Sequence, residues 1–440
     1  MSLPVEAKPE PAKPLWERDD VDVLLRAWAK RNWVEILMGI GIALRVIQYL
    51  GGRTYWLDEG SLAANIRRDG WSAIFGRLTS AQLAPPGFLL VESIFCKLFG
   101  GGPYSLRFFP LVGGIATLFL MRWIGARLLN PVAAGIAVGL ACLSDDLMYY
   151  SSELKQYSTD VAFGLICYGI ALDVLEEPLR WRKSILLALA GSLIIWFSHP
   201  AVFVLAGLGC TLLVAEIRRG DWPKIWRLVF IGSTWVLSFV GLYFVAMEQL
   251  GHRLDMWAFW EFAFPRVPPR SAWEASWPLR RVIFYLVNPL SFHSPFGPLP
   301  TALPVFALLL VGCWTLLRSN PVTLGMLVMP GFVTLLASYL QKYPFHGRLI
   351  LFLAPAFLML IAEGADRIRR GASSKFVRIG VLVAIFLPPA WVSTNSRLSP
   401  LYREYHNMIG DRRPFTEDPA NFPFDHPPRR YPRSERQTSP

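Results

Sequence analysis

Charged residues are scarce in this chain. Asp, Glu, Lys and Arg together make up 17% of its 440 residues, whereas a soluble domain carries roughly 25%. Hydrophobic residues reach 53%, so there is too little charged surface to keep a folded chain of this length dissolved. The composition therefore excludes an ordinary soluble enzyme, a disordered chain and a collagen-like chain.

Cysteine is also rare, and phosphate-binding glycine loops are missing. The five cysteines lie inside apolar segments without a CxxC pair, which indicates small buried side chains rather than a disulfide framework. No Walker A or GxGxxG sequence occurs, which argues against a nucleotide-dependent enzyme. The net charge is +12, but no basic stripe lies on a soluble domain, so we expect no nucleic-acid partner. No set of metal ligands stands out, and a divalent cation is left open as a cofactor.

Long apolar stretches are abundant instead. They recur from Val34 to Ser393, and each is about long enough to cross a hydrocarbon layer of ~30 Å. The predicted fold class is therefore an all-α polytopic membrane protein with about eleven transmembrane helices. The candidate spans are 34–50, 108–124, 131–148, 160–175, 184–198, 200–215, 227–247, 299–317, 321–340, 346–365 and 376–393.

The stretch 83–99 is ambiguous, because it is short and contains Glu92 and Lys97. If it does not cross, the short loops on the predicted cytoplasmic side hold 15 Lys and Arg among 48 residues, against 14 among 133 on the other side. Basic residues favour the cytoplasmic side, and a crossing at 83–99 would invert this bias. We therefore predict an interfacial helix at 83–99, a cytoplasmic N-terminus and an extracytoplasmic C-terminus.

This topology divides the chain into three parts. Residues 1–33 form a cytoplasmic segment without a signal peptide, and residues 34–393 form the membrane domain. Residues 394–440 are rich in Pro and Arg and are expected to be a disordered tail. The predicted outer segments are 51–107, 149–160, 248–298 and 341–348.

Asp58 and Glu59 form the first candidate site, in the first outer segment. Adjacent residues do not share a helix face, so we expect only one of them to act as a base and the other to orient the acceptor. Asp58 is the preferred base, although the order could be reversed. The alternative is that the pair merely starts a helix, where acidic residues are favoured.

A second group follows the third predicted span in the sequence SDDLMYYSSELKQYSTD. Glu153 and Tyr157 would lie on one helical face, as would Tyr157 and Asp160, and Lys155 could bind a phosphate. The alternative is an interfacial belt of tyrosines in which Lys155 reaches toward lipid headgroups.

The third group is QKYPFHGR, at residues 341–348. Lys342, Tyr343, His346 and Arg348 supply several donors within seven residues, and arginine can bind a phosphate through two hydrogen bonds. Contacts with lipid headgroups are the alternative. His199, at the outer turn between two spans, could position a substrate or simply cap the chain reversal. Tryptophans of the loop 248–298 could stack on sugars or form an interfacial belt.

Several of these motifs resemble the C-type glycosyltransferase superfamily. They are WLDEG in the first outer segment, APPGFLL in the interfacial stretch, the arginine of YSLRFFPLVGG, and YYSSELKQYSTD. The segment KYPFHGRLILFLAP further resembles bacterial members of family 39, the group of protein O-mannosyltransferases and lipid A aminoarabinose transferases. The resemblance covers about 34–175 and 341–365. Ala84 and Lys155 differ from the histidine and the arginine that are common in the family.

The resemblance implies transfer of a sugar from a polyprenyl-phosphate donor to a lipid, glycan or protein acceptor at the outer face of a bacterial inner membrane. It implies a catalytic role for Asp58, with Glu59 beside it. It matches Arg107 to the family's arginine before the second span, and it matches Glu153, Lys155 and Tyr157 to the family's second-loop motif. The chemistry is consistent, because one carboxylate base and a few cations that neutralise the leaving phosphate are sufficient.

We therefore predict a membrane glycosyltransferase in which Asp58 is the base and several donors hold the phosphate. These donors are Lys155, Arg348, His346, Arg107 and Tyr343. Two alternatives are a transporter or lipid flippase, and a non-catalytic scaffold. Transporters usually carry charges or broken helices in the middle of spans and paired repeats. Here Arg45 is the main charge inside a span, and the two halves of the chain are not similar.

Overall fold

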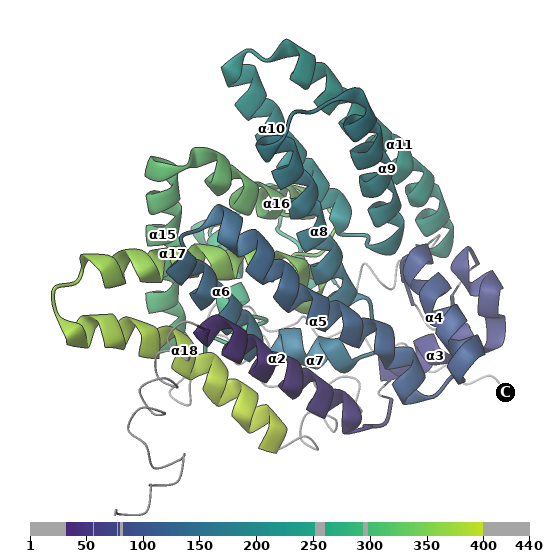
Figure 1. Ribbon diagram of the computed structural model, residues 1–440. Coiled ribbons are helices and arrows are strands. Elements are labelled where there is room, and N and C mark those ends of the chain that lie inside the picture. The colour runs from purple at the N-terminus through teal and green to yellow at the C-terminus, as the bar shows by residue number, and fades with distance from the viewer. Residues whose placement is uncertain are drawn as a thin grey trace, which may run out of the picture.

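The computed structural model describes residues 32–55, 57–76, 78–79, 82–250, 260–293 and 298–398. The predicted N-terminal segment 1–33 and tail 394–440 lie almost entirely outside the described residues. Within the described ranges every regular element is a helix, which confirms the all-α class (Figure 1).

Within the described residues, eleven helices lie where the eleven spans are predicted. They are α2 (Trp33–Leu50), α5 (Pro103–Leu128), α6 (Pro131–Leu143), α8 (Tyr157–Glu176), α9 (Trp181–Phe197), α10 (Ala201–Arg219), α11 (Trp222–Leu250), α15 (Leu299–Ser319), α16 (Pro321–Tyr339), α17 (Ala354–Gly371) and α18 (Lys375–Leu398). In the described part of the chain, nine stretches are long and apolar enough to cross a bilayer, and α6 with the segment after it makes a bent tenth. Helix α9 has only 17 residues, so the count of eleven is not confirmed.

The remaining helices are short. They are α3 (Leu57–Asp69), η2 (Gly70–Ile74), α4 (Pro86–Phe99), α7 (Asp145–Tyr149), η3 (Tyr150–Ser152), η4 (Glu261–Ala263), α13 (Ala272–Ala275), α14 (Trp277–Val287) and η5 (Gly347–Leu353). With 13 and 14 residues, α3 and α4 are about 20 Å long, which is too short to cross a bilayer. This agrees with an interfacial stretch at 83–99.

Helix α4 begins where its two prolines require it to begin. Pro85 adopts an extended conformation ahead of the helix, and Pro86 occupies its first position, where a missing N–H costs nothing. Gly87 then lies against Phe197, because a Cβ at this position would meet the ring carbons at 2.6–2.8 Å. This close approach joins α4 to the outer end of α9.

The outer helices share a small hydrophobic core that joins two outer segments. Leu62 and Ile66 of α3, Phe88 of α4 and Leu106 of α5 pack together with Leu154 of the loop before α8. Each of these side chains is at most 1% exposed. The first and second outer segments are therefore held in one rigid unit, which brings their polar residues together.

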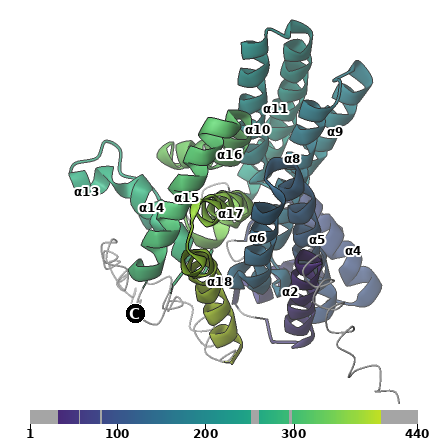
Figure 2. The ribbon, with the colours of Figure 1, turned by 60° about the vertical axis from the view of Figure 1, so that its left-hand side comes forward.

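The long helices form a continuous bundle. Helix α5 packs on α2, α6 and α8; α10 packs on α8 and α16; and α9 packs on α11. Helix α17 lies between α15 and α6, as Figure 2 shows. Gly312 of α15 and Gly364 of α17 face each other's backbone, so a Cβ at either position would collide with a carbonyl of the other helix. Small residues at such crossings let membrane helices pack closely.

Arg45, the charged residue predicted inside a span, is fully buried in α2. Its guanidinium donates to the carbonyl oxygens of Gly41 and Ala141, at 3.0 Å each. Ala141 belongs to the last turn of α6, whose carbonyls lack partners within the helix and form the negative end of its dipole. Directly after this turn, the chain bends by 62° into α7 and η3.

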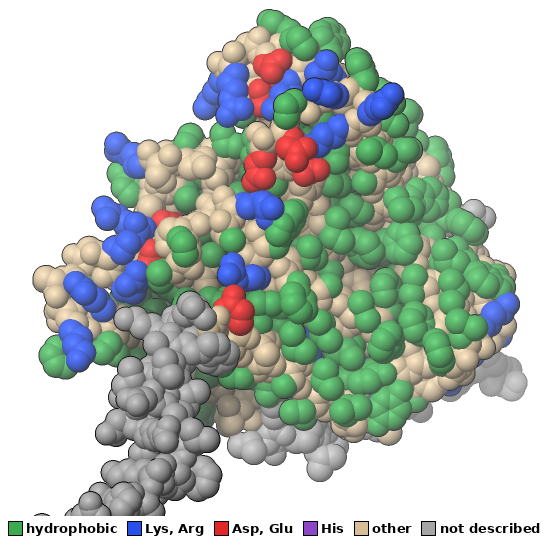
Figure 3. All heavy atoms as spheres, in the orientation of Figure 1, with side chains coloured by type: hydrophobic (Ala, Val, Ile, Leu, Met, Phe, Trp, Pro, Cys, Tyr) green, Lys and Arg blue, Asp and Glu red, His purple; other side chains and the backbone are tan. Residues whose placement is uncertain are grey.

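Basic side chains gather at the ends of helices. Lys183 forms an ion pair with Glu177, Lys224 with Glu216, and Arg370 with Asp366. In Figure 3 the Lys and Arg side chains cluster over the ends of α9–α11 and of α17 and α18, whereas hydrophobic side chains cover most of the rest of this face. This distribution fits a multi-pass membrane protein with one strongly basic side.

Candidate functional site

Asp58 and Arg348 form an ion pair between the first and the last predicted outer segments. Arg348 Nη2 lies 2.9 Å from Asp58 Oδ2, although 290 positions separate them in the sequence. Asp58 lies in the first turn of α3, and Arg348 is the second residue of η5. The two side chains are 28% and 23% exposed, so both still reach solvent. The predicted base and a predicted phosphate ligand therefore meet at one accessible point.

Lys155 approaches the same carboxylate through Gln82. Its ammonium donates to Gln82 Oε1, and Gln82 Nε2 lies 3.5 Å from Asp58 Oδ1. Lys155 is 5% exposed, and burial, the largest influence, lowers its pKa despite the nearby Asp58. Burial opposes ionisation of Asp58, but Lys155 and Arg348 outweigh it and lower the pKa of Asp58. Asp58 is thus an ionised carboxylate at neutral pH, which is the protonation state that a general base needs.

Glu153 lies in extended backbone ahead of α8, with φ −119° and ψ 137°. The expectation that Glu153 and Tyr157 share a helical face is therefore wrong, since α8 begins only at Tyr157. Tyr157 and Asp160 do lie on α8. Two serine hydroxyls of η3 bond back to the carbonyls of Met148 and Tyr149, and these bonds compete with continuation of the helix.

Tyr157 forms one wall of the cluster. The guanidinium of Arg348 lies 5.6 Å from the centre of its ring, within reach of a cation–π interaction. The Tyr150 ring meets the Tyr157 ring edge-on at 5.1 Å. Tyr157 is only 7% exposed, so it fixes the direction of Arg348 rather than presenting a large surface to a ligand.

Glu59 and Arg107 form a separate, fully buried pair. Arg107 donates to both carboxylate oxygens of Glu59, at 2.8 and 2.6 Å, and also to the carbonyls of Arg53 and Thr54. Glu59 in turn accepts the backbone N–H of Leu154 at 2.7 Å. The neighbouring acids therefore point to different partners, as expected. This geometry favours a structural role for Glu59 and Arg107 over the predicted contacts with acceptor and donor phosphate.

Arg53 contacts the residues that lead into the second outer segment. It donates to the carbonyl of Ser152 at 2.9 Å, and its guanidinium lies 4.1 Å from the centre of the Tyr149 ring. Neither Arg53 nor Gln82 could be predicted from the sequence, because both lie in irregular segments without a motif. Both became visible only through contacts with residues more than 70 positions away.

His346 and Tyr343, predicted as donors to a phosphate, instead contact other groups of the protein. His346 is 5% exposed, and its Nδ1 lies 3.0 Å from Arg281 Nη1 of α14. The rings of Phe284 and Phe262 lie 4.9 and 5.0 Å from the His346 ring. Tyr343 donates its hydroxyl to the carbonyl of Leu349 at 2.6 Å. Both residues therefore fix the shape of the segment that carries Arg348.

His199 occupies the turn between α9 and α10. Burial lowers its pKa to about 4, so the imidazole is neutral at pH 7. Its Nε2 has no hydrogen-bond partner among the described residues. No contact joins it to Asp58, Lys155 or Arg348 in the described part of the chain, and its predicted role in positioning a substrate stays a prediction.

The tryptophans of the outer loop pack largely against protein. The Trp277 ring meets Tyr339 and Phe345 edge-on, and Arg280 lies 3.9 Å from the centre of the Trp273 ring. Trp257 lies outside the described residues. These contacts favour a role in loop structure for Trp273 and Trp277.

No group of three His, Cys, Asp or Glu side chains suited to a metal ion occurs among residues that the structure describes. Asp58 already pairs with Arg348, and Lys155 adds a second positive charge close to the same carboxylate. These two cations repel a divalent ion, so the residues of this site do not fit a resident metal.

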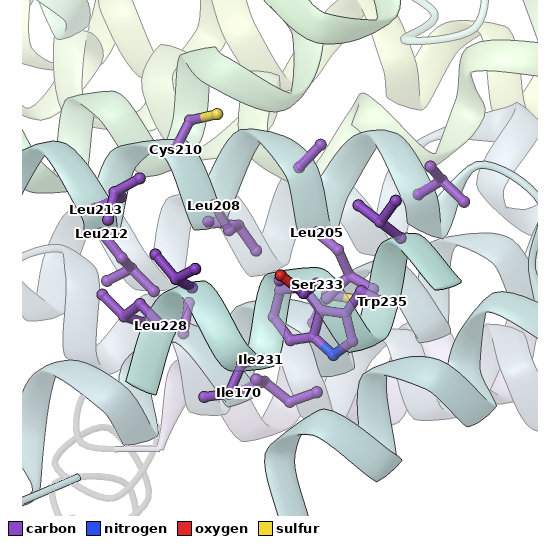
Figure 4. Close-up of a pocket in the computed structure, with 18 of the residues that line it drawn as sticks. Ile170, Leu205, Leu208, Cys210, Leu212, Leu213, Leu228, Ile231, Ser233 and Trp235 are labelled. Carbon is purple, nitrogen blue, oxygen red and sulfur yellow. The ribbon is translucent and has the colours of Figure 1, made fainter. Parts of the chain in front are cut away.

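A hydrophobic cavity of about 610 Å³ lies apart from this cluster, between α8, α9, α10 and α11 (Figure 4). None of the described residues that line it is charged. Along α8 its wall at Ile170 is about 20 Å from Tyr157. The cavity can hold hydrocarbon, but it has no groups for acid–base chemistry. It is lined by Ile170, Leu205, Leu208, Leu212, Ile231 and Trp235, among others.

The fold has solved counterparts, although no protein-family model and no curated protein matches the sequence. ArnT from Cupriavidus metallidurans in the apo state superposes with a TM-score of 0.55 and 16% identity, over 87% of this chain and 78% of that one. The same ArnT bound to undecaprenyl phosphate gives 0.54 and 14%, over 86% and 78%. The oligosaccharyltransferase of Archaeoglobus fulgidus, tethered with an acceptor peptide, gives 0.54 and 13%, over 92% of this chain and 60% of that one. The chain thus shares its fold with ArnT and with this archaeal oligosaccharyltransferase.

Proposed function

We propose that the protein is a glycosyltransferase that moves a sugar from a polyprenyl-phosphate donor to a hydroxyl acceptor. The observation that carries this proposal is the ion pair between Asp58 and Arg348, with Lys155 one side chain away. One accessible carboxylate beside two cations is what a base and a leaving phosphate require. The undecaprenyl phosphate bound by ArnT, whose fold this chain shares, supports a lipid phosphate as the donor's leaving group.

The donor phosphate would bind to Lys155 and Arg348. Arginine can form two parallel hydrogen bonds to a phosphate, and lysine adds a point charge. When the phosphate draws these cations away from Asp58, the influence that lowers the pKa of Asp58 weakens. Donor binding therefore makes Asp58 a stronger base at the moment when a base is needed.

In the transfer step, the acceptor oxygen attacks the anomeric carbon and forms the new glycosidic bond. The bond between that carbon and the phosphate oxygen breaks, and its electron pair stays on the phosphate beside Lys155 and Arg348. Asp58 takes the proton of the acceptor hydroxyl. The family resemblance further implies inversion at the anomeric carbon.

We place the reaction at the extracytoplasmic face of a bacterial inner membrane. The site lies in the segments that the distribution of basic residues puts outside. Tyr157, through its contact with Arg348, and Glu153 and His199 are proposed to position the substrates. The acceptor is a lipid, a glycan or a protein.

The direct test is Asp58→Asn in the purified protein, with a panel of radiolabelled undecaprenyl-phosphate sugars. Loss of a general base costs about 10²–10⁴-fold in turnover, whereas binding of undecaprenyl phosphate should persist because the two cations remain. Asp69→Asn is the matched control, since Asp69 lies on the same helix and pairs with the exposed Arg68. Turnover near wild type in Asp58→Asn would show that Asp58 is not the base.

The same assay separates the enzyme from a transporter or flippase. A glycosyltransferase yields labelled acceptor in detergent, where no compartment exists. A transporter yields uptake into sealed vesicles and no covalent product. Labelled product with the wild type and none with Asp58→Asn is the result expected here.

A further inference from the structure

Glu153 is the one acid of the cluster whose carboxylate has no hydrogen-bond partner among the described residues. Asp58 is paired with Arg348, and Glu59 with Arg107. Glu153 is fully buried, and neither of its side-chain oxygens has a donor in that part of the chain. An unpaired carboxylate in a buried site is costly, and such a group binds a proton to become neutral.

Charged groups of three other segments surround this side chain. Glu59 of α3 repels it, while Arg53, which precedes α3, and Arg348 of η5 attract it. Lys155 of its own loop adds a third attraction. Arg107 of α5 is held by Glu59, and Tyr157 of α8 is a titratable group that interacts electrostatically with Glu153. The charge of Glu153 is therefore balanced by Arg53 and by the two cations of the proposed phosphate site.

We propose that Glu153 takes up a proton when a phosphate binds to Lys155 and Arg348, so that donor affinity is coupled to protonation of this residue. This inference rests on the phosphate site of the proposed function. A bound phosphate brings a negative charge to the far side of the two cations. The attraction that keeps Glu153 ionised is then offset, and the carboxyl becomes neutral.

The surroundings of Glu153 determine the pH range in which donor affinity depends on its protonation. Burial, reinforced by Glu59, raises its pKa to about 7 in the free protein. A bound anion raises this pKa further, so the complex holds more protons than the free protein at and above pH 7. Affinity is then highest below pH 7 and falls as pH rises, by up to about tenfold per pH unit for one proton. Asp58 has a lowered pKa and stays ionised throughout this range.

The experiment measures phosphate binding and proton uptake together. The probe is farnesyl methyl phosphate, a phosphodiester whose single charge does not change between pH 6 and 9. Calorimetric titration of the purified full-length protein at pH 8, in buffers of different ionisation enthalpy, gives the number of protons bound per probe. We expect about 0.5–1 proton for the wild type and near zero for Glu153→Gln. The dissociation constant should rise with pH in the wild type and stay flat in Glu153→Gln.

Glu92→Gln is the matched control. Glu92 is also a fully buried glutamate whose oxygens have no hydrogen-bond partner among the described residues, but it lies in α4. Burial alone raises its pKa well above the usual range. No charged group of the cluster contributes to this shift, so replacing Glu92 should leave the proton uptake that accompanies phosphate binding unchanged.

The outcomes separate the two proposals. Binding with no proton uptake in the wild type, or uptake that persists in Glu153→Gln, overturns the role of Glu153 and leaves the phosphate site intact. A probe that binds equally well to wild type and Arg348→Met overturns the phosphate site itself. A probe that does not bind at all overturns both.

Discussion

The adjacent acids of the first outer segment show how one residue step changes the role of a side chain. Asp58 turns toward solvent and Arg348, whereas Glu59 turns inward to Arg107 and to the backbone of Leu154. Successive helical residues point about 100° apart, so two neighbours can belong to a reactive surface and to a buried support at once.

Glu59→Gln should destabilise the protein strongly. The substitution leaves the guanidinium of Arg107, which is 3% exposed, without its counter-charge. Breaking a buried ion pair from one side costs about 3–5 kcal/mol. Thermal unfolding in detergent should show a clearly lowered midpoint. Glu35→Gln is the control, because Glu35 is 52% exposed and its pair with Arg122 contributes at most about 1 kcal/mol. Equal midpoints for the two variants would contradict the structural role of Glu59.

The residue types of the site could be predicted from the sequence, but their partners could not. Asp58, Lys155 and Arg348 stand out as ionisable residues that collect in the predicted outer segments. Their pairing depends on contacts across up to 290 positions, which no local period encodes. Gln82 has no motif at all, yet it joins Lys155 to Asp58.

At the level of elements, the break between α6 and α7 determines where the second outer segment lies. Hydrophobic length predicts one span over 131–148, and the chain instead bends by 62° after Leu143. The bend leads directly into η3 and the loop with Glu153 and Lys155. The sequence has no proline or glycine at this point, so the bend depends on tertiary contacts. Arg45 donates to the carbonyl of Ala141, and Ser144 and Asp145 bond to the segment that follows α14.

Arg45→Met should therefore loosen the bend. The change removes a charged donor from the Ala141 carbonyl and leaves that buried acceptor unpaired, at a cost of about 1–3 kcal/mol. We expect a lower unfolding midpoint, together with weaker binding of undecaprenyl phosphate, as the loop with Lys155 loses its fixed position. Arg45→Lys should recover part of both, and the exposed Arg122→Met should change neither. A stable Arg45→Met variant with normal phosphate binding would rule out this role.

At the level of the whole molecule, the number of helices that cross the membrane determines on which side each loop lies. The sequence identifies the apolar helices well, because composition alone distinguishes them. The sequence predicts the topology less well where the length of a helix is marginal, as in α9 with its 17 residues, and where no local signal marks a bend. Helix α9 matters most, since every loop after it changes sides if it does not cross.

Single cysteines at exposed positions can decide this question. Ser72 and Val267 lie in predicted outer segments with six predicted crossings between them, and Ser319 lies in a predicted inner loop. In intact cells, an impermeant maleimide should label Ser72→Cys and Val267→Cys, and it should label Ser319→Cys only after permeabilisation. The five native cysteines lie in helices and are first replaced by serine or alanine.

If α9 stays on one side, only five crossings separate Ser72 from Val267, so Val267→Cys would be protected and Ser319→Cys labelled. That pattern would also move Arg348 to the opposite side from Asp58, which their 2.9 Å ion pair forbids. The ion pair therefore requires an even number of crossings between the two residues, and the eight predicted crossings between them, α9 included, meet this requirement.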